Sequence, residues 1–115
     1  MTAMRTAAEV GRANRRAGRK LERAAQVALE GAGWFVLRTG AGQAGVVDLV
    51  ALRGVAYRTS SVFVQCKVNG YMLPADRAKL LALVKECNAT PVVATWEKPA
   101  KGPRHVTFRN LEDET

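Results

Sequence analysis

The sequence predicts a single α/β domain in which helices pack on a mixed β-sheet. Its length of 115 residues is about that of one domain. Two segments carry apolar residues at helical spacing, and five short runs are rich in β-branched and aromatic residues. One helical segment separates the third run from the fourth. The resulting order, αβββαββ, favours a mixed sheet with helices on it over a sandwich or a barrel.

The first helix is predicted over residues 18–30. Its apolar side chains recur at helical spacing, at Leu21, Ala24, Ala25, Ala28 and Leu29. Gly31 and Gly33 then supply a stop signal. This helix opens the predicted folded domain.

Five strands and a second helix are expected after it. The strands are predicted at residues 34–39, 46–53, 61–68, 91–96 and 105–109. The first three form the simplest meander, and the last is a short edge strand. Pro74 is expected to open the second helix, which ends near Asn88. Its predicted apolar face consists of Leu80, Leu83, Val84 and Cys87.

Positive charge dominates the chain, with 18 Lys and Arg against 10 Asp and Glu, a net charge of +8 and a pI near 10.2. Nucleic acid is therefore the first partner to consider, and an ordinary solvated surface is the alternative. Charge and apolar patterning divide the chain into a basic arm at residues 1–17, mobile or partly helical, a folded domain at 18–110, and an acidic tail at 111–115.

Several classes of protein are excluded by the pattern of residues. No apolar run approaches the ~20 residues of a membrane span, and the basic N-terminus lacks the apolar stretch of a secretory signal. Two cysteines and one histidine provide neither a disulfide scaffold nor a four-ligand zinc site. We therefore expect a cytoplasmic protein, associated with the nucleoid, or located in the host cytoplasm if the source is viral.

Four polar residues form the candidate site. Asp48 interrupts an apolar strand, where a carboxylate is costly unless it is paired, bound to a ligand or at a sheet end. Gln65 and Lys67 lie two residues apart on the next strand and so share a face. A hairpin would bring them beside Asp48, and Glu22 can reach in from the first helix. The oxygen donors suit Mg²⁺, while Lys67 would orient the attacking water, help to deprotonate it and stabilise the developing charge in phosphodiester hydrolysis.

Four ordered motifs resemble those of the PD-(D/E)XK nucleases, and within them the archaeal-type Holliday junction resolvases. They are Gly18-Arg19-Lys20-Leu21-Glu22-Arg23, Arg38-Thr39-Gly40-Ala41-Gly42, Val47-Asp48-Leu49-Val50-Ala51 and Val64-Gln65-Cys66-Lys67. The resemblance covers about residues 18–96. It implies a restriction-endonuclease-like αβββαβ core in the 18–110 nuclease domain. It also implies a homodimer that cuts two strands of a four-way DNA junction symmetrically, in DNA recombination and repair.

The resemblance also assigns roles to individual residues. Glu22, Asp48, Gln65 and Lys67 would be catalytic, and the first three would hold Mg²⁺, for which Mn²⁺ could substitute. The residues expected to contact DNA are Arg19, Lys20, Arg23, Arg38, Gly40 and Gly42. Gln65 departs from the family, which usually has Glu there, so weaker metal binding is expected. A QxK motif is similar to that of Mrr-type restriction nucleases. The alternatives are therefore an Mrr-like duplex endonuclease or an inactive DNA-binding module.

Other residues have simpler interpretations. Asp48 alone could cap a strand end, Glu22 could belong to a solvated ion network, and Arg38 could simply be exposed. Core packing is expected for Cys66, Cys87, Trp34 and Trp96, and a structural or exposed position for His105. Tyr71 and Met72 could pack in the core or form an apolar patch at a dimer interface.

Overall fold

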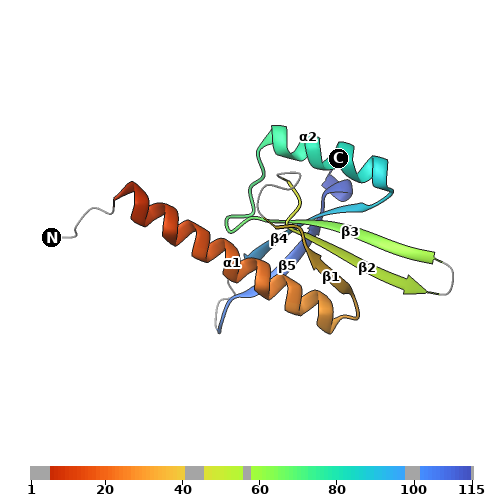
Figure 1. The fold of residues 1–115 in the computed structure, drawn as a ribbon, viewed down its shortest axis with the longest axis horizontal. Coiled ribbons are helices and arrows are strands. Elements are labelled where there is room, and N and C mark those ends of the chain that lie inside the picture. The colour runs from red at the N-terminus through yellow and green to blue at the C-terminus, as the bar shows by residue number, and fades with distance from the viewer. Residues whose placement is uncertain (1–5, 41–45, 56–57, 98–101, 115) are drawn as a thin grey trace.

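A computed structural model describes residues 6–40, 46–55, 58–97 and 102–114 (Figure 1). The elements are α1 (Ala7–Gly31), β1 (Phe35–Arg38), β2 (Leu49–Val55), β3 (Arg58–Cys66), α2 (Pro74–Cys87), β4 (Thr90–Glu97), β5 (His105–Asn110) and the 3-10 helix η1 (Leu111–Glu114). The predicted order αβββαββ is confirmed.

The strands form one mixed sheet in the order β1-β2-β3-β4-β5. Neighbouring strands are antiparallel except β3 and β4, which are parallel and are connected through α2. A parallel pair needs such a crossover, because the chain must return to the same end of the sheet before it can run in the same direction again. The predicted α/β fold, a mixed sheet flanked by helices, is therefore confirmed.

α1 begins at Ala7 and not at residue 18, where the apolar pattern places the start; of the two alternatives for the basic arm, the helical one therefore holds for residues 7–17. The Thr6 hydroxyl accepts a hydrogen bond from the Glu9 backbone N–H at 3.1 Å and so caps the helix. None of the residues 7–20 is buried, and Figure 1 shows this half of α1 projecting beyond the sheet. Alanine and arginine have high helix propensity, so the segment is helical without the apolar periodicity that would predict it.

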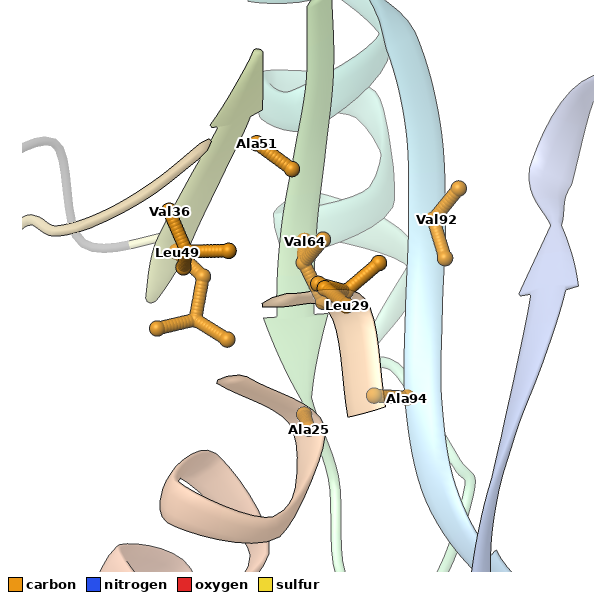
Figure 2. Close-up of a cluster of buried hydrophobic side chains, with 8 residues drawn as sticks. All are labelled: Ala25, Leu29, Val36, Leu49, Ala51, Val64, Val92 and Ala94. Carbon is orange, nitrogen blue, oxygen red and sulfur yellow. The ribbon is translucent and has the colours of Figure 1, made fainter. Parts of the chain in front are cut away.

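Two apolar clusters cover the two faces of the sheet. The first joins Ala25 and Leu29 of α1 to the sheet residues Val36, Leu49, Ala51, Val64, Val92 and Ala94 (Figure 2). The second joins α2 and η1 to the other face through Val46, Val47, Met72, Leu80, Val84, Val93 and Leu111. The chain therefore has three layers, with α1 on one face of the sheet and α2 on the other.

Leu80→Ala is expected to lower the free energy of unfolding by about 2–5 kcal/mol, because Leu80 is fully buried under α2 and its removal leaves a cavity. Urea denaturation would measure the change. Leu73→Ala makes the same substitution at a side chain that is 57% exposed and is the matched control. Equal losses for both variants would contradict the assignment of Leu80 to the core.

The structure also corrects expectations for individual residues. Asp48 lies outside β2, which begins at Leu49, because Val46 and Val47 pack into the second cluster before the strand starts. Cys87 is exposed, since α2 ends at this residue.

Trp96 is only partly buried, and no core cluster includes it; Arg104 stacks over its ring instead, 5.3 Å from the centroid. Tyr71 and Met72, which follow β3, were expected either to pack in the core or to form an exposed apolar patch. Met72 packs in the core, and Tyr71 is exposed.

Candidate active site

Asp48 is held in place at the end of the sheet where β1, β2 and β3 meet. Its backbone N–H donates to the Val64 carbonyl at 2.8 Å, and its own carbonyl accepts from the Thr39 N–H at 3.2 Å. Its neighbours Val47 and Leu49 are both buried in the core. These contacts leave the Asp48 side chain at the sheet end, where Oδ2 accepts a 2.7 Å hydrogen bond from the Cys66 N–H.

Glu22 reaches the same place from α1. A pocket beside Glu22 and Asp48 is also lined by Arg15, Gly18, Arg19, Arg38, Thr39 and Gly40. We call it the carboxylate pocket. Arg38 Nη2 lies 3.5 Å from Glu22 Oε2, and the Arg38 side chain remains half exposed. Glu22 and Asp48 thus lie beside the same pocket, as predicted. Three arginines, Arg15, Arg19 and Arg38, also line this pocket and could bind an anionic ligand.

Burial and mutual repulsion perturb both carboxyl groups. Burial raises the pKa of Glu22, the negative charge of Asp48 raises it further, and Arg38 lowers it. Burial also raises the pKa of Asp48, against the opposing effects of the Cys66 N–H and the Lys67 charge. The pKa of the Cys66 thiol is raised by burial and by the two carboxylates, so Cys66 stays protonated and is a poor metal ligand. Two repelling carboxylates in one pocket favour a bound cation.

Because burial raises both carboxyl pKa values, ionisation of these groups costs stability in the folded state. Their favourable contribution is complete below the unfolded values of 4.5 and 3.8 and is lost as the pH rises through the higher folded values. Asp48→Asn should therefore raise the melting temperature at pH 7 in a chelator, with a smaller gain near pH 4. Thermal melts at both pH values would test this, with the exposed Glu86→Gln as control; a lower melting temperature at pH 7 would contradict it.

Gln65 and Lys67 approach Asp48 from β3. Leu49 pairs with Val64 in antiparallel register, so the position before Leu49 lies opposite Gln65. Lys67 follows the end of β3, and its charge acts on Asp48. Gln65 is only 6% exposed, and its Oε1 has no hydrogen-bond partner among the described residues. It does not line the carboxylate pocket.

The donor set fits a divalent cation that prefers oxygen. No group of three or more His, Cys, Asp and Glu side chains that could hold a metal occurs within the described part of the chain. Glu22 and Asp48 bring two carboxylates to the pocket. Gln65, which lies opposite Asp48 in the strand register, has a buried amide oxygen without a hydrogen-bond partner among the described residues. A buried polar atom without a partner is costly, and a bound cation would satisfy it.

The fold is shared with a solved structure, that of Archaeoglobus fulgidus Hjc, a Holliday junction resolvase from an archaeal hyperthermophile. The TM-score is 0.61 and the sequence identity 19%, and the match covers 81% of this chain and 75% of the other. No protein-family model matches the chain, and neither does any curated protein. At this identity the likeness establishes the α/β fold and leaves the chemistry to be argued from the residues.

The structure separates the residues that were expected to contact DNA. Arg19, Arg38 and Gly40 line the carboxylate pocket, whereas Lys20 and Arg23 line a groove on another side of α1. Gly42 lies outside the described residues.

Sequence reasoning missed three lining residues, Arg15, Gly18 and Thr39. Arg15 stands four and seven positions before Arg19 and Glu22, the spacing of one helix face, but the helix was expected to begin only at residue 18. Thr39 had a weaker signal, its place between Arg38 and Gly40 at the end of a strand. Its hydroxyl donates to the Val47 carbonyl and so helps to hold the backbone beside Asp48.

Proposed function

We propose that this protein is a metal-dependent DNA endonuclease that resolves four-way junctions by paired, symmetric phosphodiester cuts. The observation that carries the proposal is the pair of carboxylates, Glu22 and Asp48, in a pocket whose other charged side chains are arginines. Carboxylates that bind a hard cation beside arginines that bind phosphate are the combination that phosphodiester hydrolysis needs. The net charge of +8 and the fold shared with a solved junction resolvase support DNA as the substrate.

Each residue of the site has a chemical task. Glu22, Asp48 and the Gln65 amide oxygen would hold Mg²⁺ or Mn²⁺, which when bound neutralises charge on the scissile phosphate and lowers the pKa of a bound water. Asp48 is oriented for this by the Cys66 N–H. Lys67 would orient the attacking water, and its ammonium would stabilise the negative charge developing on phosphorus. Arg19 and Arg38 would bind the flanking phosphates.

We further propose that the active form is a homodimer. One protomer with one carboxylate pocket has no second site for the symmetric partner cut, whereas a two-fold axis supplies it. Phe35 and Leu37 on the edge strand β1 are 64% and 47% exposed, which gives the protomer apolar surface for such a contact. Sedimentation of the native protein would measure its mass in solution.

The decisive experiment is cleavage of an end-labelled four-way junction and a matched linear duplex, with and without Mg²⁺. We expect two symmetric cuts in the junction alone, dependent on Mg²⁺ and abolished by Asp48→Asn. Equal cutting of both substrates would instead support an Mrr-like duplex endonuclease. Tight binding without cutting would support an inactive DNA-binding module, and would contradict the proposal.

A further inference from the structure

A second groove runs along the other flank of α1. It is lined by the apolar side chains of Ala24, Val27, Ala28, Trp96 and Val106 and by Lys20, Arg23, Arg104 and His105. We call it the Trp96 groove. Its strand residues come from β4 and β5, whereas the carboxylate pocket lies at the end of β1 and the start of β2. Because β1 and β5 are the opposite edges of the sheet, the two sites open at opposite edges, with α1 between them.

The helix periodicity explains this division of the α1 side chains. Arg15, Arg19 and Glu22 follow one another at intervals of four and three residues and line the carboxylate pocket. Lys20 and Arg23 are also three residues apart, but they are rotated around the helix toward β4 and β5. Arg15 and Arg19 therefore face the carboxylate pocket, whereas Lys20 and Arg23 face the Trp96 groove.

The charge of the Trp96 groove is not compensated from within the described residues. Lys20, Arg23 and Arg104 have no ion pair in this part of the chain. The nearby carboxylate of Glu97 lies 3.1 Å from His105 Nε2. Unpaired cations gathered around a groove create a positive potential that attracts an external anion.

Arg104 is also prepared for an anion by its contact with Trp96. Its guanidinium lies 5.3 Å from the centroid of the Trp96 ring. A guanidinium stacked on an aromatic face keeps its N–H donors free at its edge, and the stacking restricts its motion. Such an edge matches the two oxygens of a phosphate group. The three cations and the stacked guanidinium of Arg104 therefore favour a ligand that carries phosphate groups, on a lining that is otherwise largely apolar.

We propose that the Trp96 groove binds the phosphate backbone of a second DNA segment, separate from the strand that enters the carboxylate pocket. The inference rests on the proposed function and extends it to substrate selection. A four-way junction offers separate arms to the two sites, whereas a short linear duplex that occupies one of them leaves the other empty. The groove would thus favour branched DNA over duplex without taking part in the chemistry.

The test is equilibrium binding in a chelator, with all proteins carrying Asp48→Asn so that no DNA is cut. Lys20→Gln, Arg23→Gln and Arg104→Gln are combined in one variant. The control combines Arg58→Gln, Lys79→Gln and Lys85→Gln, which removes the same charge from exposed positions outside both sites. Fluorescence anisotropy would measure the affinity for a four-way junction, and for a linear duplex as long as one pair of arms, over a range of salt concentrations.

We expect the groove variant to bind the junction at least about tenfold more weakly at 0.1 M salt, with the slope of log K against log salt reduced by up to about 3. Duplex binding should change much less, and the control should retain its junction affinity. Equal losses on junction and duplex, or an equal loss in the control, would overturn the proposal. So would a loss of dimer in sedimentation, which would make the groove a protein interface.

A single substitution and a separate cleavage assay distinguish loss of the groove from misfolding and from failure of the nuclease proposal. Arg104→Gln alone should show a smaller loss in the same direction, and it serves if the triple variant fails to fold, which thermal melts would reveal. Cleavage by native protein is tested separately. If the native protein cuts no DNA but the groove variant loses junction binding, the groove assignment stands and the nuclease proposal fails. If the native protein cuts the junction but the groove variant keeps its junction affinity, the groove assignment fails and the nuclease proposal stands.

Discussion

Lys67→Met is expected to lower the rate of junction cleavage by about 10²–10⁴-fold, the range typical for loss of a group that acts on protons or on developing charge. Methionine keeps most of the apolar stem but removes the ammonium. Lys67 lies directly after β3, and its charge acts on Asp48. Its loss should therefore affect chemistry at the site more than folding. Single-turnover cleavage at saturating protein would measure the rate.

The controls separate a chemical role from DNA binding. Junction affinity measured in a chelator should fall only modestly in Lys67→Met, by about one phosphate contact. Lys85→Met makes the same substitution at an exposed position on α2 and should cut at the native rate. If Lys67→Met retained native cleavage, the assignment of Lys67 to the reaction would be wrong.

Gln65→Glu is expected to tighten Mg²⁺ binding by at least about tenfold, because the number of charged ligands strongly tunes the affinity of an oxygen site. Gln65 is almost fully buried next to Asp48 in the strand register. Without metal, a third carboxylate there adds repulsion and a desolvation cost, so the melting temperature in a chelator should fall. Added Mg²⁺ should then raise the melting temperature more than it does in the native protein.

Melting temperatures across a Mg²⁺ titration would measure this effect independently of cleavage. Asn14→Asp adds the same charge on the projecting half of α1 and should leave the Mg²⁺ response unchanged. An unchanged Mg²⁺ response in Gln65→Glu would remove residue 65 from the metal site. Cleavage that appears only in Gln65→Glu, and not in the native protein, would identify the natural chain as an inactive DNA-binding module.

The fold was largely predictable because its signals are local. Apolar spacing marks the buried stripe of α1 through Leu21, Ala25 and Leu29, and β-branched runs mark the strands. The errors concern segments that are not buried, where the spacing of apolar residues carries no information about the structure. Residues 7–17 form a helix outside the core, and Cys87 lies where α2 ends. A local sequence pattern cannot show which residues of a helix remain exposed because no other part of the fold packs against them.

The sequence by itself determined the order of the elements and identified Asp48, because a carboxylate between buried apolar residues requires a local explanation. Only the tertiary structure decided which cations surround it. Burial of one stripe of α1 sets the rotation of the helix, and the strand order sets which sheet edge lies beside each flank. Arg19 therefore faces the carboxylate pocket while its neighbour Lys20 faces the Trp96 groove, because contacts between distant segments, and not sequence proximity, place side chains together.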